Sequence, residues 1–558
     1  MILILVQTTL FLANVNAILL EKFTVNYPLL NERWEKYQNE EGKVYFWSET
    51  NKRSQWEDPR EEELKVKNAP GGGGGGSGTT IGTNTNSALG NNQQQSQTHE
   101  EQEIERLNIK SRLNPDIIPS IHALRVNRLN MSQVLSEENT LYKMALKIKK
   151  FLSSFEKCFY IGFNSINFDE EFLRQLFWEH FFYPYVTNTK GSVRGDLFNF
   201  VTMAHAFDKE ILNVERNDEG KLSFKLEKLA TANNFDSSNS HEAIADVEVT
   251  MQIINLLKDK NYEFFKIFSE NSTAKKVEET IKQNDIFTLH NYLFNNHRIY
   301  LVKKLIKHPS YKNQMIGFDL KYDVDNIVNM SEQEISIDYK KKSFFRKIKL
   351  NKQPNILDKS YAMKFNPYSS LSDEEIKIKC EKLNSQSFLE KLRNILYKES
   401  IDFLDNQSQE PSFEEDTIYS QNLNYEDSLI MQNFHLEAWE KKWNYAERFK
   451  DQRLKFFAAK YLYRNHPETL PKKIFLHFHK KISERILSLE KQKFLTLPAA
   501  MEEADTISLE IEESGENLKL SEQLTQYNIY INFLDDYYKQ QNPKPLKFDS
   551  NLSKKLFG

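Results

Sequence analysis

The chain has 558 residues, of which 39% are hydrophobic and 28% charged, with a formal net charge of -4. This length suffices for several domains with sizeable cores. The near-neutral charge excludes a protein that binds nucleic acid through its overall charge. Any surface that binds nucleic acid must therefore be a local basic patch. The two cysteines, Cys158 and Cys380, exclude a disulfide framework and a cysteine zinc site and favour a reducing compartment.

Residues 1–28 form an apolar segment. Apolar runs that end at small residues near Ala17 resemble a secretory signal, but polar residues interrupt them and no basic residue precedes them. A misplaced gene start explains the segment equally well. No membrane association is expected, because a spanning helix needs about 20 mostly apolar residues. We expect a cytoplasmic or nuclear location, with secretion as the alternative if the segment is a true signal peptide.

Residues 29–60 alternate aromatic and polar side chains between turn-forming residues, which predicts a short three-stranded sheet. The spacing of Trp34, Trp56 and Pro59 around the aromatic run that includes Tyr45 resembles a WW domain. The resemblance implies that Tyr45 and Trp56 form an open groove for a proline-rich peptide. The acidic first loop would repel a phosphate, so we expect an unphosphorylated ligand. A folded spacer without a ligand is the alternative.

Residues 61–104 are predicted to be a disordered linker. The segment contains six consecutive glycines from Gly71, followed by runs rich in asparagine and glutamine. Such a composition cannot bury enough apolar surface to order itself. The linker therefore separates residues 29–60 from the rest of the chain.

A new globular region begins near residue 105. Its pattern predicts a strand over 107–109, an amphipathic helix over 132–155, a buried strand over 158–162 and a helix over 198–207. Asp169 follows the second strand and opens a helix with one apolar face, which is where α/β sheets place their chemistry. Further on, His241 and Asp246 flank the start of another predicted helix. These two side chains can converge on one site if the histidine lies on the preceding loop.

Motifs in one order along the chain resemble those of bacterial exodeoxyribonuclease I, a DEDDh exonuclease built on a ribonuclease-H-like sheet. They comprise residues 162–171, 181–185, 194–197, 223–229 and 241–246, then 318–320 and 350–354, then 451–454, 461–465 and 467–470. The resemblance implies a multidomain α/β protein, with a ribonuclease-H-like exonuclease domain over 105–258, connecting helices and a small β-barrel domain over 259–360, and a C-terminal helical domain over 361–558. An all-β WW domain would precede these domains.

The resemblance also implies a catalytic site. Enzymes of this class hold two magnesium ions with a cluster of carboxylates, and a histidine deprotonates the attacking water. Asp169 and Asp246 match two of the metal-binding carboxylates, and His241 matches the base. Arg194 and Asp196 match further family positions, in either a structural or a functional role.

One part of the family pattern is missing. An Asp-x-Glu pair should lie on the central first strand, but the strand-like residues 2–6 carry no acid. We therefore expect the sheet to lack its middle strand and the site to bind two metal ions poorly. The family also has a longer, strand-rich insert where this chain passes directly from residue 310 to residue 317. These departures leave open an imperfect or fused gene model.

A strip of basic and aromatic residues in the expected barrel could bind DNA, because cations neutralise phosphates while rings stack on unpaired bases. The strip comprises Lys340, Lys341, Lys342, Phe344, Arg346, Lys347, Lys349 and Lys352. A helix predicted over 300–307, with three further lysines, would extend it. A solvated β-face is the alternative.

The leading hypothesis is a magnesium-dependent 3′→5′ exodeoxyribonuclease that degrades single-stranded DNA in repair or recombination, with a WW module that binds proline-rich peptides. The alternative is a catalytically inactive protein that binds single-stranded nucleic acid and recruits WW ligands. In both cases the expected partners are single-stranded DNA and a proline-rich peptide, and the protein is expected to be a monomer.

Overall fold

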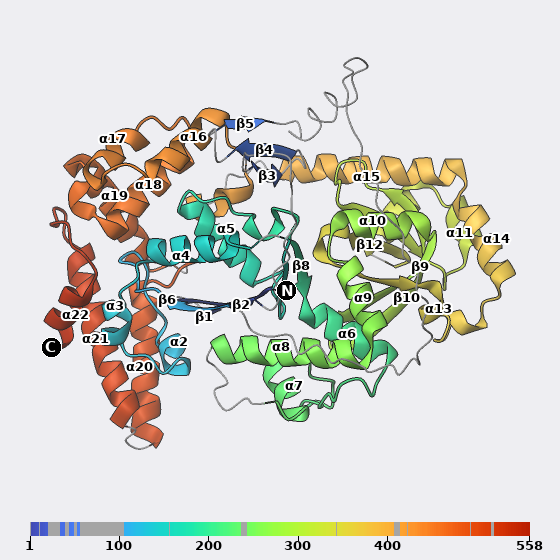
Figure 1. The fold of residues 1–558 in the computed structure, drawn as a ribbon, viewed down its shortest axis with the longest axis horizontal. Coiled ribbons are helices and arrows are strands. Elements are labelled where there is room, and N and C mark those ends of the chain that lie inside the picture. The colour runs from blue at the N-terminus through green and yellow to red at the C-terminus, as the bar shows by residue number, and fades with distance from the viewer. Residues whose placement is uncertain are drawn as a thin grey trace, which may run out of the picture.

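A computed structural model describes the backbone of five N-terminal strands and most of residues 105–558. The N-terminal strands cover residues 2–9, 12–19, 34–38, 44–48 and 53–55. The later part excludes residues 156, 236–242, 342, 407–412, 421, 491–492 and 515–517. Figure 1 shows a mixed sheet at the centre, a second sheet with its helices on one side and the C-terminal helices on the other.

The central sheet has five strands in the order β6-β2-β1-β7-β8. Its strands are β1 (Ile2–Thr9), β2 (Leu12–Leu19), β6 (Glu105–Lys110), β7 (Phe159–Gly162) and β8 (Val193–Asp196). The first strand pairs antiparallel with β2 and parallel with β7, which in turn pairs parallel with β8. The expectation that the middle strand is missing is therefore wrong, because β1 occupies that position.

Helices cover both faces of this sheet because consecutive residues of β7 point to opposite sides. Tyr160 packs with the apolar faces of α4 (Leu141–Ser153) and α5 (Asp169–Glu179). Ile161 packs on the other side with α6 (Leu197–Phe207) and α8 (Ala243–Lys260). The short helix α7 (Leu226–Ala232) adds to this second core.

The helix predicted over 132–155 is in fact two helices, α3 (Met131–Ser136) and α4. The break is fixed by Thr140, whose side chain caps α4 by accepting a hydrogen bond from the backbone N–H of Lys143 at 3.2 Å. Apolar side chains of α3 and of α2 (Ile121–Val126) pack in the core of the C-terminal helices rather than on the sheet. The chain therefore crosses between domains twice near its first described helices.

The second sheet is antiparallel, with five strands in the order β12-β11-β10-β9-β13. The strands are β9 (Ile286–Leu293), β10 (Asn296–Lys307), β11 (Gln314–Asp319), β12 (Phe345–Lys349) and β13 (Asn355–Asp358). Within the described residues the pairing leaves β12 and β13 as edges of an open sheet, so the expected small barrel is not observed. The predicted helix over 300–307 is wrong, because this run forms the C-terminal two thirds of β10, the central strand of the sheet.

Helices surround the second sheet and form the C-terminal region. Those around the sheet are α10 (Ala274–Gln283), α11 (Val324–Asn329), α12 (Glu332–Lys341), α13 (Lys359–Ala362), α14 (Asp373–Leu383) and α15 (Gln386–Asn406). The helix α9 (Tyr262–Glu270) packs with α6 and α8 in the core of the central sheet. The C-terminal helices are α16 (Tyr425–Phe434), α17 (Lys442–Ala446), α18 (Gln452–Asn465), α19 (Lys472–Ile486), α20 (Leu497–Ser514), α21 (Leu518–Tyr538) and α22 (Ser550–Phe557). The latter share one large apolar core, as expected for a helical domain.

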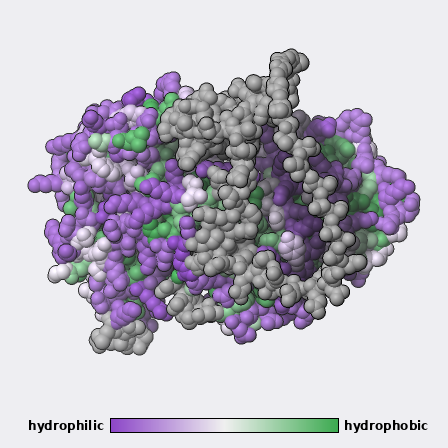
Figure 2. Space-filling model, viewed as in Figure 1, coloured by the Kyte–Doolittle hydropathy of each residue, from purple (hydrophilic) through white to green (hydrophobic). Residues whose placement is uncertain are grey.

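A third sheet lies within residues 29–60. Its strands β3 (Trp34–Gln38), β4 (Val44–Ser48) and β5 (Arg53–Gln55) form an antiparallel sheet in chain order, which confirms the predicted three-stranded topology. Among the residues that the structure describes, no helix is long and apolar enough to cross a membrane. The described surface visible in Figure 2 is largely hydrophilic, with small scattered apolar patches.

Candidate active site

The loop that follows β7 is held by a buried carboxylate at the end of the neighbouring strand. Asp196 accepts hydrogen bonds from the backbone N–H groups of Asn164 at 2.8 Å and Ile166 at 3.3 Å. It also caps α6 by accepting from the N–H of Phe198 at 3.1 Å. Asp196 therefore has a structural role, in which it fixes the loop that delivers Asp169 to the first position of α5.

Asp169 carries the most unusual electrostatics of this region. Its side chain is buried, with 6% of the residue exposed, and burial is the main cause that raises the pKa of its carboxyl to about 8. The nearby negative charges of Asp196, Glu170 and Asp246 act in the same direction. Asp246 lies in the first turn of α8 and is half-buried. The fold thus brings together the two aspartates that the sequence predicts to act as a pair.

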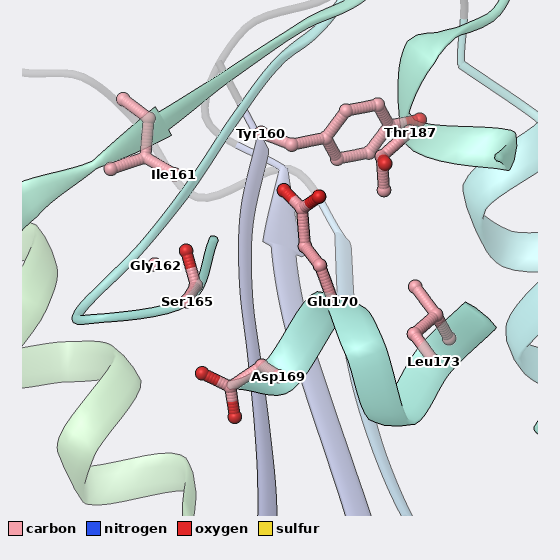
Figure 3. Close-up of a pocket in the computed structure, with 8 residues that line it drawn as sticks. All are labelled: Tyr160, Ile161, Gly162, Ser165, Asp169, Glu170, Leu173 and Thr187. Atoms are coloured by element: carbon pink, nitrogen blue, oxygen red, sulfur yellow. The ribbon is translucent and has the colours of Figure 1, made fainter. Parts of the chain in front are cut away.

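The neighbouring Glu170 has a different environment, because two arginines neutralise it. Its carboxylate forms ion pairs with Arg174 at 3.1 Å and with Arg194 of β8. Figure 3 shows the Glu170 carboxylate directed towards Tyr160 and Thr187, whereas the Asp169 carboxylate points to the opposite side of the pocket. Arg194 is therefore a charge partner inside the domain. The i, i+4 spacing of Glu170 and Arg174 on a helix is the sequence signal that could have identified this pair.

A turn of the second sheet supports the same loop. In η2 (Leu350–Lys352), Lys352 donates from Nζ to the carbonyl of Ile166 at 3.2 Å and lies 3.7 Å from Glu171 Oε1. Arg194 donates from Nη2 to the carbonyl of Asn351 at 3.1 Å. The next residue, Gln353, accepts at Oε1 from the backbone N–H of Asp196 at 2.5 Å. The site therefore lies where two domains meet, which no local sequence pattern shows.

The residues present can be tested against the two magnesium ions that the sequence resemblance implies. Magnesium binds proteins through one or two carboxylates and keeps several waters, so Asp169 and Asp246 suit a single ion. Two ions need further acids, and β1 carries none in Ile2–Thr9. Among the described residues, no group of three or more histidine, cysteine, aspartate or glutamate side chains could hold a metal. In the part of the chain that the structure describes, the donor set therefore fits one magnesium ion and lacks the acids for two.

Several predicted site residues fall outside what the structure describes. His241, the predicted base, lies in the undescribed stretch 236–242, directly before α8. Trp56 is also outside the described residues, and Tyr45 lies on β4, where only the backbone is described. The roles of these three residues remain predictions.

The predicted DNA-binding strip does not form one continuous surface. Lys340 and Lys341 are exposed at the end of α12, Lys349 is exposed at the end of β12, and Lys342 lies outside the described residues. Lys347 instead pairs with Glu399 at 2.6 Å.

Two further members of the strip are engaged inside the second domain. Phe344 is 5% exposed and packs against Phe318, so its ring is not available for stacking on a base in this structure. Arg346 pairs with Asp319 at 2.5 Å and lies over the Tyr300 ring. The expected stacking ring and one expected cation therefore stabilise this domain.

Comparison with known proteins points to one family. Residues 414–531 match the family model described as the Exonuclease I C-terminal domain. Over 233 residues the chain is 31% identical to exodeoxyribonuclease I of Haemophilus influenzae, which covers 41% of this chain and 49% of that protein. Exodeoxyribonuclease I of Escherichia coli K12 is 25% identical over 225 residues, covering 39% of this chain and 47% of that protein. The chain thus matches about half the length of these curated relatives.

Solved structures show the same fold. The crystal structure of E. coli Exonuclease I in complex with a dA16 oligonucleotide has a TM-score of 0.62 and 18% identity, covering 78% of this chain and 93% of that chain. A moderately thermophilic Exonuclease I from Methylocaldum szegediense gives a TM-score of 0.64 at 18% identity, covering 78% and 92%. The chain therefore shares the multidomain α/β fold of Exonuclease I, including a helical C-terminal part.

Proposed function

We propose that this protein is a 3′→5′ exonuclease that removes nucleotides from single-stranded DNA, in DNA repair or recombination. One observation carries the proposal most directly: Asp169 is buried at the carboxyl end of β7 with its pKa raised to about 8, and Asp246 of α8 contributes to that shift. Burying acids together is costly unless a cation or proton compensates them. A site of this kind suits a ligand that brings positive charge.

Asp169 and Asp246 would hold one magnesium ion, which when bound would neutralise negative charge on the phosphate to be cleaved. His241 would take the proton of the attacking water, a role suited to an ordinary histidine pKa near neutrality. Asp196 fixes the loop that carries Asp169. The exposed Lys340, Lys341 and Lys349 would contact phosphates of the strand away from the cleaved bond.

The test is nucleotide release from a single strand labelled at its 3′ end, with a strand labelled at its 5′ end and a duplex as comparisons. We expect magnesium-dependent release of the 3′ label first, from the single strand. Asp246→Asn should remove it, because the amide loses the negative charge. The matched control is Asp259→Asn, an exposed acid on the same helix, which should leave the rate unchanged. Binding of the strand without any release would instead support the inactive binding protein.

We also propose that residues 29–60 bind an unphosphorylated proline-rich peptide. The support is the antiparallel order β3-β4-β5, which is the topology expected from the WW resemblance. A fluorescent proline-rich peptide should bind the full chain, and Trp56→Ala should abolish this binding while single-stranded DNA still binds. Peptide binding retained by the variant would contradict the groove formed by Tyr45 and Trp56.

A further inference from the structure

Two exposed phenylalanine rings stand beside the buried Asp169. Phe168 is the residue directly before it and Phe172 lies one helical turn further along α5, with 46% and 41% of their surfaces exposed. Their rings meet edge to face, with centroids 4.9 Å apart and an interplanar angle of 67°. Positions i and i+4 share one helix face, so the helix presents both rings on one side while Leu173 and Phe177 fill the core.

Glu171, which lies between the two phenylalanines in sequence, contacts an aromatic and a cationic group from two other parts of the chain. Tyr419 of η4 (Glu414–Tyr419) is 49% exposed and donates its hydroxyl to Glu171 Oε2 at 2.5 Å. Lys352 approaches the other oxygen of Glu171 at 3.7 Å, and Arg174 donates to that oxygen at 2.7 Å. Glu171 is thus neutralised by cations and would repel a phosphate only weakly.

Rings beside cations are what a single-stranded nucleic acid binds, because each unpaired base has a face that can stack while the backbone needs positive charge. Single exposed apolar residues are ordinary on protein surfaces, but these two touch each other and adjoin the proposed reaction site. We propose that Phe168 and Phe172 form an aromatic step on which the bases at the 3′ end of the strand stack, which positions the last phosphodiester bond near Asp169.

This inference rests on the proposed function and specifies how the site would select its substrate. Stacking uses the ring face common to all bases, so the step would accept any sequence. A duplex end would bind less well, because its bases are already stacked and paired. Phe168 and Phe172 would therefore be positioning residues that favour single strands, while the chemistry depends on the aspartates.

The experiment compares short single strands with a normal 3′ end and with abasic 3′-terminal nucleotides. Affinity is measured by fluorescence anisotropy without magnesium, and nucleotide release is measured separately with magnesium. For Phe168→Ala and Phe172→Ala we expect roughly 10-fold weaker binding of the normal strand, with little change for the abasic strand. The conservative variants Phe168→Trp and Phe172→Tyr should restore binding. In the release assay the alanine variants should raise KM more than they lower kcat.

The matched control is Tyr262→Ala. Tyr262 opens α9 and is 63% exposed, and its ring centroid lies 6.0 Å from that of Phe265. Neither Asp169 nor Asp246 lies on this helix. The Tyr262→Ala variant should bind the normal and the abasic strand as tightly as the unchanged protein does. If the alanine variants lose equal affinity for the normal and abasic strands, or lose none, the aromatic step is contradicted even if nucleotides are released. If the unchanged protein releases no nucleotides but the alanine variants still lose affinity for the normal strand only, the proposed catalysis is contradicted and the aromatic step is supported.

Discussion

Asp196 shows how a single buried acid can hold a loop and cap a helix at the same time. It is 1% exposed, and burial is the main cause that raises the pKa of its carboxyl to about 7. Its three backbone hydrogen bonds, from Asn164, Ile166 and Phe198, partly offset that cost. The hydrogen bonds therefore explain why an acid at position 196 suits this loop.

Two substitutions of Asp196 distinguish the stability contributed by its hydrogen bonds from that contributed by its negative charge. Asp196→Ala should lower the free energy of unfolding by about 2 kcal/mol or more, because it removes a helix cap and leaves buried N–H groups without an acceptor. Asp196→Asn keeps one acceptor oxygen and should cost less. Urea denaturation of both variants measures the difference. Equal losses for alanine and asparagine would show that the charge, and not the hydrogen bonds, holds the loop.

At the same scale, the sequence pattern predicted where Asp169 and Asp246 lie but not the partners that surround them. A strand followed by an acid and an amphipathic helix is a local signal, and both aspartates are found where it placed them. The contacts of Glu170 with Arg194 and of Lys352 with Ile166 join segments far apart in sequence. An aromatic residue among lysines fits a surface or a core position equally well, and the structure buries Phe344.

Between the central sheet and the second sheet, three histidines form a hydrogen-bonded chain. Asn355 donates from Nδ2 to His290 Nδ1 at 3.2 Å, so His290 carries its proton on Nε2 and donates to His297 Nδ1 at 3.1 Å. His297 then donates from Nε2 to His205 Nδ1 at 3.2 Å. This order requires all three rings to be neutral, because a second proton on any ring would place two N–H groups against each other.

Burial is the main cause that lowers the pKa of His205 to about 4 and of His290 and His297 to about 3, and the nearby Lys209 acts in the same direction. For a base with a lowered pKa in the folded state, the stabilisation is full above the unfolded pKa of about 6.5 and is lost as pH falls towards the folded value. The packing of β9 and β10 against α6 should therefore weaken between about pH 6.5 and pH 4.

The variant His297→Gln tests this element. Glutamine can accept a hydrogen bond from one neighbour and donate one to the other, but it does not titrate. The free energy of unfolding of the His297→Gln protein should therefore fall less steeply over that pH range. His122→Gln is the control, because His122 is exposed on α2 and should keep the steep dependence of the unchanged protein. If the free energy of unfolding of His297→Gln falls as steeply with pH as that of the unchanged protein, other groups cause the loss of stability.

A second element-scale feature is the buried ionic network that attaches α18 to the domain of the central sheet. Arg464 makes two hydrogen bonds of 2.7 Å to Asp116 and lies 3.3 Å from Glu179 at the end of α5. Lys460, one turn earlier, joins Glu179 at 2.9 Å and Glu415 at 2.7 Å. Although burial alone would raise the pKa of the Asp116 carboxyl, the charge of Arg464 outweighs it and the pKa is lowered.

Removing one member should leave an uncompensated buried charge. We expect Arg464→Met to lower the free energy of unfolding by about 3–5 kcal/mol. Arg125→Met is the control, because the Arg125–Glu510 pair is 46% and 47% exposed and should cost no more than about 1 kcal/mol. Chemical denaturation measures both, and similar small losses in the two variants would contradict the importance of the network.

The order of elements was easier to predict than their long-range pairing. The strand β7 and the helices α5, α6 and α8 lie where local periodicity predicted them. The prediction of a helix over 300–307 is wrong because a short apolar segment with lysines fits the repeat of an α-helix and that of a β-strand equally well. Its strand conformation is stabilised by pairing with β9 on one side and β11 on the other, and such pairing depends on residues distant in sequence.

For the whole molecule, the main surprise is the position of the first strand. Residues 2–9 read as an apolar segment without acids, yet β1 pairs parallel with β7 through Ile2 opposite Tyr160 and Leu3 opposite Ile161. Among the described residues, β1 is therefore the middle strand of the order β6-β2-β1-β7-β8, although it carries none of the carboxylates expected there. The chain therefore combines the Exonuclease I fold with a first strand that carries no acidic side chain.

We propose that Asp169 and Asp246 together form a catalytic site on this fold. The most direct measurement is nucleotide release from a 3′-labelled single strand across a magnesium titration, for the full chain and for Asp169→Asn. With two carboxylate ligands we expect weak metal binding and therefore release that saturates only at millimolar magnesium, is lost in Asp169→Asn and leaves affinity for the strand intact. No release at any magnesium concentration, from a chain that still binds the strand, would contradict the claim.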